Sequence, residues 1–295
     1  MFAIWFGHLA TVAVVLLFFF YGAKLKREDI ISGIAQWRLH VTVLASTFIL
    51  FPLITFALHF FMPDLLSKNL WAGFLFLALL PSTVQSSIVF TSIAGGNISA
   101  AIAAASVSQL IGIFLTPLMV AVFLGSSGAR ASFDSILSIV MIIFLPFIIG
   151  HLSRPWIGDW VAGNKRLIGY SDKAAILLVV FSAFCAATVN GIWSQVPPMI
   201  FVKILALSVI IFFLVLSGTF LAGRLAGFKI EDRIVVLFCG TKKSLVQGVP
   251  MARVLFPGPE QGLILLPVMM FHQFQLMACS VIAQHYGRRL EGVET

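Results

Sequence analysis

Two polar stretches interrupt segments of the chain that are otherwise apolar. The first, Pro81–Ser87, reads Pro-Ser-Thr-Val-Gln-Ser-Ser and lies inside the apolar segment 70–94. The second, Gly240–Pro250, lies inside segment 234–255 and contains Lys242, Lys243, Ser244 and Gln247. A helix that breaks at membrane depth leaves backbone N–H and C=O groups unpaired, which is tolerated only inside protein or beside a wet cavity. Because such breaks bind solutes and ions in transporters, the sequence predicts a binding site here.

The two stretches share a pattern, Ser-x-Val-Gln followed by a small residue. Gln85 and Gln247 are 162 positions apart, and the same offset carries position 41 to 203 and position 98 to 260. All four positions lie close to the starts of apolar segments, so three pairs of elements keep one register. Loop parity gives the two units opposite directions, which predicts an inverted repeat. The alternative is coincidence, because the shared pattern is short.

Lys242 and Lys243 are the most informative residues of the second stretch. At 1.5 Å per residue they lie roughly 12–14 Å from the end of their segment, close to the membrane midplane. Placing an unpaired ammonium there costs on the order of 3 kcal/mol of insertion free energy, unless the ammonium is paired or reaches water. In one interpretation the lysines snorkel or bind carbonyls structurally. In a second interpretation one lysine ammonium replaces a coupling cation. In a third, both lysines attract an anionic substrate. The sequence does not indicate which of the two lysines is the more important.

A third polar cluster, His272, Gln273 and Gln275, lies within the apolar segment 262–286. Three polar side chains so close together indicate a wet helix face, although a lone histidine is more often a satisfied core residue. Ser106, Ser108 and Gln109, in segment 98–124, have the same character.

The elements that position these residues are membrane helices. The chain of 295 residues is 60% apolar and 10% charged, with a mean hydropathy of +1.06. An average soluble domain has roughly 25% charged residues, so soluble and disordered proteins are both excluded. The net charge of +8 comes from basic residues in short loops rather than on one face, which excludes a nucleic-acid partner.

The sequence offers little to an enzyme. Cys185, Cys239 and Cys279 are isolated in apolar segments, so no disulfide or metal site is predicted. All eleven acidic residues fall in predicted loops or at helix ends, which leaves no carboxylate at mid-membrane. Catalytic and nucleotide-binding motifs are also absent. We therefore predict no enzymatic activity and no cofactor.

Nine apolar segments approach or exceed the length of about 20 residues that a membrane-spanning helix needs. They are 3–23, 41–61, 70–94, 98–124, 133–153, 174–193, 199–223, 234–255 and 262–286. With loops assigned alternately to two sides, one side collects thirteen Lys and Arg residues and the other four. The positive-inside rule then predicts a multi-pass protein of the cell (inner) membrane, with its N-terminus outside and its C-terminus in the cytoplasm.

Several motifs resemble one family of transporters. They are Gly22–Leu25, Gly95–Asn97, Gly150–Trp160, Cys239–Leu245 and Phe271–Met277. With these residues, and over essentially its whole length, the chain resembles the SBF-like branch of the bile acid:sodium symporter family, and the eukaryotic calcium-regulator branch is similar.

The resemblance implies an all-α polytopic fold with nine transmembrane helices, in which an inverted repeat places two broken helices across each other in a core beside a panel. The implied units are 1–32 (panel helix), 33–127 (core, spans two to four), 128–196 (panel, spans five and six), 197–287 (core, spans seven to nine) and 288–295 (cytoplasmic tail). Bacterial relatives have ten spans, so a first panel helix is missing here, either from the protein or from the sequence upstream of Met1.

The resemblance also implies a binding site at the crossing. In sodium-coupled members, Ser, Thr or Asn groups of the first broken helix and a Glu and a Gln of the second hold the cation. The matching first set is Ser82, Thr83, Gln85, Ser86 and Ser87, and Gln247 matches the Gln. Sodium would then lie near Gln85, Ser86 and Gln247. Residues 234–255 contain no Glu, so sodium coupling is in doubt.

These observations predict a secondary active transporter, similar to a symporter, that moves a small organic anion by alternating access. The coupling ion is sodium or a proton, and the lipid bilayer is its surrounding partner. The alternative is a membrane regulator of calcium or other cation entry that transports little itself and acts on an ion-channel partner.

Overall fold

The computed structural model describes residues 2–24, 36–125, 137, 140–191 and 196–291. Helices dominate these ranges, and no strand occurs within them. Three predicted features lie outside the described residues: the start of the 133–153 span, the unit boundaries near 32 and 127, and the end of the tail at 292–295.

The described helices follow in one order along the chain. They are α1 (Phe2–Lys24), α3 (Trp37–Ala45), the π-helical turn Ser46–Leu50, α4 (Phe51–Phe61), the short 3-10 turn Pro63–Leu65, α5 (Lys68–Leu79), α6 (Gln85–Ile93), α7 (Ile98–Leu124), the π-helical turn Val140–Phe144, α9 (Leu145–Leu152), α10 (Arg154–Gly163), α11 (Lys165–Val189), α12 (Pro198–Leu225), α13 (Ile230–Thr241), α14 (Leu245–Leu255) and α15 (Gln261–Glu291).

Five stretches of helix in the described part of the chain are long and apolar enough to cross a membrane. They are Trp37–Phe61, Ile98–Leu124, Arg166–Val189, Pro198–Leu225 and Gln261–Arg288. The pair Val140–Leu152 and Arg154–Gly163, bent by 93°, makes a sixth if it is one span. The structure is therefore that of a multi-pass, all-helical membrane protein.

Two predicted spans are divided at their polar stretches. α5 and α6 have 12 and 9 residues, and α13 and α14 have 12 and 11. Each piece is shorter than the roughly 20 residues of a full span. The first break has a local cause, because a residue before proline avoids helical dihedrals. Leu80, which precedes Pro81, is extended (φ −73°, ψ 151°) and ends α5.

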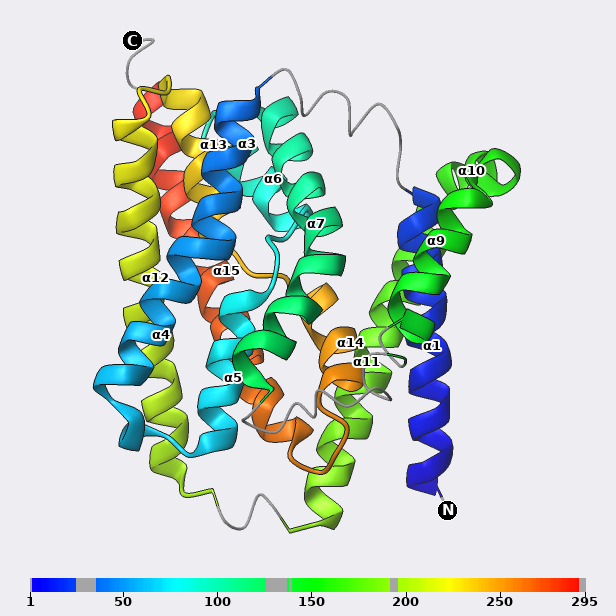
Figure 1. The fold of residues 1–295 in the computed structure, drawn as a ribbon. Coiled ribbons are helices and arrows are strands. Elements are labelled where there is room, and N and C mark those ends of the chain that lie inside the picture. The colour runs from blue at the N-terminus through cyan, green and yellow to red at the C-terminus, as the bar shows by residue number, and fades with distance from the viewer. Residues whose placement is uncertain (1, 25–35, 126–136, 138–139, 192–195, 292–295) are drawn as a thin grey trace.

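The two breaks touch each other inside the bundle. The backbone N–H of Ser244 donates to the carbonyl of Pro81 at 2.8 Å. Along the chain, α5 leads up to α6 in Figure 1, whereas α13 leads down to α14, so the two broken helices run in opposite directions. This contact joins residues 163 positions apart in sequence and places the two polar stretches at one point of the fold.

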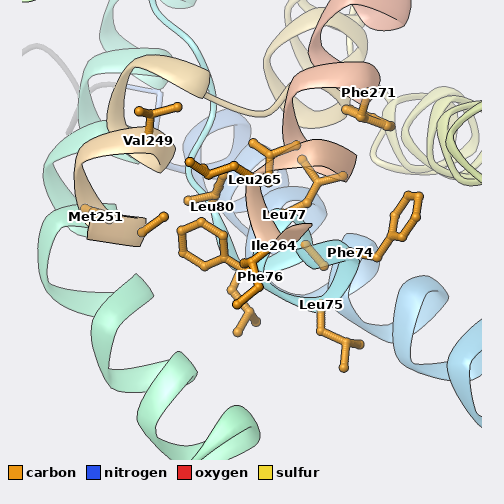
Figure 2. Packing of buried hydrophobic residues seen from close by; sticks show 14 of the residues in the cluster. Phe74, Leu75, Phe76, Leu77, Leu80, Val249, Met251, Ile264, Leu265 and Phe271 are labelled. Carbon is orange, nitrogen blue, oxygen red and sulfur yellow. The ribbon is translucent and has the colours of Figure 1, made fainter. Parts of the chain in front are cut away.

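An apolar core holds the broken helices in place. Figure 2 shows Leu77 of α5 beside Leu265 of α15, and the ring of Phe76 on the side of Met251 of α14. α5 is buried along nearly its whole length, from Leu70 to Leu79. Because a buried helix exposes no polar face, α5 reads as a continuous apolar run rather than an amphipathic one.

α1, α9, α10 and α11 form a second group of helices, with α1 in close contact with α9 and α11 (Figure 1). α11 begins at Lys165, which is nine residues before the predicted span at 174. Basic residues such as Lys and Arg are good helix formers, and hydropathy alone undervalues them. The prediction that residues 165–173 form a loop is therefore wrong, and the charged residues of this stretch lie on a helix.

Candidate functional site

A cavity of about 680 Å³ lies between the two helix breaks and the group formed by α1, α9 and α11. Its lining comes from both groups of helices. The lining residues are Tyr21, Lys24, Thr83, Val84, Gln85, Ser86, Ser106, Gln109, Leu110, Ile113, Phe147, Arg166, Gly169, Tyr170, Asp172, Lys173, Ile176, Ser244, Leu245, Val246, Gln247, His272 and Leu276. The volume lies within the range of about 300–1,000 Å³ that is typical of small-molecule sites.

Half of the twelve predicted site residues line this cavity. They are Thr83, Gln85, Ser86, Ser244, Gln247 and His272. The hydroxyls of Thr83 and Ser86 are hydrogen-bonded to each other. The Gln247 Nε2 donates to the Gln109 carbonyl at 3.3 Å, whereas its buried Oε1 has no partner within the described ranges. An unused acceptor beside a cavity is available to a bound solute or water.

The remaining predicted residues lie elsewhere. Ser82 and Ser87 are fully buried behind the cavity wall, and the Ser87 hydroxyl donates to the Phe238 carbonyl at 3.3 Å. Gln273 is exposed on the outside of α15. The Gln275 side chain satisfies the backbone hydrogen-bonding groups of Lys243 at the second break. Its Oε1 accepts from the Lys243 N–H at 3.0 Å, and its Nε2 donates to the Lys243 carbonyl at 2.9 Å.

Lys243 is buried with its ammonium bound to three carbonyl oxygens. Its Nζ donates to Thr47 at 2.7 Å, Ala78 at 2.6 Å and Leu80 at 2.7 Å. Ala78 and Leu80 lie at the C-terminus of α5, where carbonyls lack helical partners and a cation is favourable. In the π-helical turn the carbonyl of Thr47 would pair with residue 52, but Pro52 has no N–H. All three donors of this ammonium are therefore used within the protein.

Lys242 is buried without any such oxygen partners. Its Nζ lies 3.7 Å from the centroid of the Phe90 ring and 5.7 Å from that of Phe238. No hydrogen-bond acceptor for this Nζ occurs in the described part of the chain. Neither lysine lines the cavity, so the structure separates two neighbours that the sequence could not rank: Lys243 joins helix ends, and Lys242 lies against aromatic rings.

Four charged residues of the cavity escaped the sequence reasoning. Lys24 is the last residue of α1, and Arg166, Asp172 and Lys173 belong to α11. Hydropathy places all four in loops, and the basic three enter the prediction only through the positive-inside rule. The spacing of Arg166, Gly169, Lys173 and Ile176 places them on one helical face, and this was the signal that could have revealed them.

These residues give the cavity a positive charge. Three cations and one carboxylate leave a net charge of +2 among the described lining residues. Lys24 and Asp172 form an ion pair of 2.7 Å. Since low-dielectric walls concentrate the field of charges inside a cleft, an anionic solute is favoured over a cationic one. The charge comes from α1 and α11, whereas polar groups come from the broken helices.

Comparison with known proteins identifies the family. Residues 3–288 match the SBF-like CPA transporter family. The chain belongs to this family. The resemblance to the bile acid:sodium symporter type is thereby confirmed, and membership of a transporter family agrees with the prediction that the protein is not an enzyme.

Relatives of this SBF-like CPA transporter occur in bacteria and vertebrates. The chain is 47% identical over 291 residues to the Escherichia coli (strain K12) protein named "Putative symporter YfeH", with 98% of this chain and 87% of that protein covered. It is 31% identical over 279 residues to sodium/bile acid cotransporter 7 of Rattus norvegicus, with 93% and 82% covered. The Danio rerio protein of that name is 31% identical over 278 residues, with the same coverage.

Proposed function

We propose that this transporter is a secondary carrier that moves a small organic anion through the cavity by alternating access. The observation that carries the proposal is the composition of the cavity wall. Both helix breaks supply polar groups, and α1 and α11 supply Lys24, Arg166 and Lys173. Apolar side chains such as Leu110, Ile113 and Leu276 complete the lining and suit the hydrocarbon part of such an anion.

The movement would separate the two groups of helices. We propose nine spans in an inverted repeat, with the broken helices in a core and α1, α9 and α11 in a panel. The opposite directions of the broken helices support this assignment (Figure 1). Because the cavity lies between core and panel, their relative displacement would expose it to one side of the membrane and then to the other.

We propose a location in the inner membrane of the cell, and the positive-inside rule supports an orientation with the N-terminus outside and the C-terminus in the cytoplasm. Lys24 and Arg166 lie at the ends of α1 and α11 that would face the cytoplasm. With this orientation the cavity of the present structure is the one that faces inward.

We further propose that sodium does not bind at the second break. The Lys243 ammonium already takes three carbonyl oxygens there, at 2.6–2.7 Å. A sodium ion beside it would face charge repulsion and no carboxylate, since the described lining contains only Asp172, which belongs to α11. A proton gradient or an anion gradient would then drive transport.

Uptake by the purified protein in proteoliposomes tests the proposal. The probes are taurocholate, 1-naphthoate and glutarate, which represent steroid, aromatic and aliphatic anions; a bile acid is included because the vertebrate relatives carry that name. We expect at least one probe to enter at the same rate in sodium and in choline buffers. Protein-free vesicles are the control. No uptake of any probe would contradict a carrier and favour a regulator that acts on a channel.

Lys243→Glu is expected to make the stability of the protein depend on sodium. The new carboxylate would lie among the three carbonyl oxygens that now hold the ammonium, and a bound cation would offset their repulsion. The midpoint of thermal unfolding should rise with sodium chloride but not with choline chloride. The wild type and Lys242→Glu serve as controls and should show no such difference. Equal midpoints of Lys243→Glu in both salts would contradict the prediction.

A further inference from the structure

The ion pair of Lys24 and Asp172 lies on the wall of the cavity. Lys24 Nζ and Asp172 Oδ2 are 2.7 Å apart, and the side chains are 35% and 16% exposed. Lys24 is the last residue of α1, whereas Asp172 lies more than a turn inside α11. The lysine is thus the more accessible partner, and the more deeply buried carboxylate of Asp172 fixes the position of its ammonium.

The carboxylate of Asp172 is only half satisfied. Its Oδ2 accepts from Lys24, but its Oδ1 is buried and has no hydrogen-bond partner among the residues that the structure describes. Native carboxylates in structural ion pairs usually have both oxygens satisfied, since an orphaned buried acceptor is unfavourable. This pair therefore does not have the features of a bridge built for stability alone.

The surroundings of Lys24 favour an exchange of anions. Its Nζ lies 5.5 Å from the centroid of the Tyr21 ring, which supports the ammonium from one side. Arg166 and Lys173 line the same cavity, so an additional negative charge would not leave the site with a net negative charge. An entering anion would find one ammonium already positioned by a protein carboxylate.

We propose that Lys24 is the residue that binds the anionic group of the substrate, and that Asp172 is a positioning residue that holds the ammonium until a carboxylate or sulfonate takes its place. This inference rests on the proposed function. It assigns the anion site to the panel helices α1 and α11, while the helix breaks contact other parts of the substrate.

Two substitutions separate this role from a structural one. Lys24→Met is expected to raise the KM for the probe that enters fastest, among taurocholate, 1-naphthoate and glutarate, by roughly tenfold or more. Asp172→Asn removes the protein carboxylate that competes with the substrate anion for the Lys24 ammonium. It should lower the KM by about two- to fivefold, which corresponds to releasing a partly exposed ion pair. Lys24→Arg should keep a KM near that of the wild type. Lys68→Met, which removes a lysine outside the cavity, is the matched control.

Labelling of Lys24 gives a readout that does not depend on transport. An amine-reactive ester should label Lys24 faster in Asp172→Asn than in the wild type, and each probe that enters should slow labelling of the wild type. If Lys24→Met and Asp172→Asn raise the KM equally, the pair is structural and the inference fails. Uptake of a probe without protection of Lys24 overturns this inference alone. The absence of both uptake and protection for all three probes overturns the proposed function as well.

Discussion

Lys243→Met is expected to lower the stability of the protein severely. The substitution removes three hydrogen bonds and leaves the carbonyls of Thr47, Ala78 and Leu80 buried without their donor. Each orphaned buried group costs roughly 1–3 kcal/mol, so we expect a loss of about 3 kcal/mol or more. At about 2–4 °C per kcal/mol, the midpoint of thermal unfolding in detergent should fall by roughly 6–12 °C. Transport should fall with it, because the end of α5 forms part of the first break.

Lys242→Met is the matched control, because it is the same chemical change one position away. Among the described residues the Lys242 ammonium has no hydrogen-bond acceptor that the substitution would leave unpaired, and it lies 3.7 Å from the centroid of the Phe90 ring. A methionine sulfur contacts aromatic rings favourably, so the midpoint should stay unchanged or rise. Equal losses in the two variants would show that burial of charge, rather than the three carbonyls, governs stability at this break.

Gly150→Ala is expected to separate α1 from α9. A Cβ at Gly150 would overlap the backbone carbonyl of Phe19, and a Cβ at Gly22 would overlap that of Phe147. The obstacle is backbone, which cannot rotate away as a flexible side chain can. Membrane helices use small residues for such close packing. Overpacking typically lowers the free energy of unfolding by roughly 1–3 kcal/mol, and we expect a loss near the upper end of that range. The midpoint of thermal unfolding should then fall by about 6 °C or more.

Gly163→Ala provides the comparison for this substitution. A Cβ at Gly163, at the end of α10, meets nothing within 4 Å. Its unfolding midpoint and uptake rate should therefore match those of the wild type. If Gly150→Ala behaves like Gly163→Ala in both measurements, α1 and α9 do not pack as closely as the structure indicates.

The first helix break was predictable because its cause is local, and the second because lysines and other polar residues interrupt an apolar segment. Pro81 cannot continue a helix, and a run such as Ser82–Ser87 has no place on a lipid-facing surface. The six predicted residues that line the cavity all belong to these stretches or to α15. His272, Gln273 and Gln275 do not share the one wet face that we predict, because Gln273 is exposed outside and Gln275 is buried. The Gln275 amide instead bonds the backbone of Lys243, a contact between residues 32 positions apart that no local pattern encodes.

The charged residues of the cavity were not predictable in the same way. Hydropathy treats Arg166, Asp172 and Lys173 as the end of a loop, because it averages over a window and ignores which face a side chain occupies. Only the packing of α11 beside α1 shows that this face meets the cavity and that Lys24 finds a carboxylate 148 positions away. The prediction that all eleven acidic residues lie in loops or at helix ends is corrected for Asp159, which lies inside α10, and for Asp172, which lies inside α11.

The amino-acid sequence by itself determined that the chain is a polytopic helical membrane protein in which polar stretches interrupt two apolar segments, since hydrophobic length and polar interruptions are properties of neighbouring residues. The tertiary structure decided what the polar residues do. Within the part of the chain that it describes, it gave Lys243 three carbonyls and Lys242 none, although the two are adjacent, and it placed the cavity's positive charge on α1 and α11. The partners of a side chain inside a bundle come from distant parts of the chain, and only the packing of whole helices brings them together.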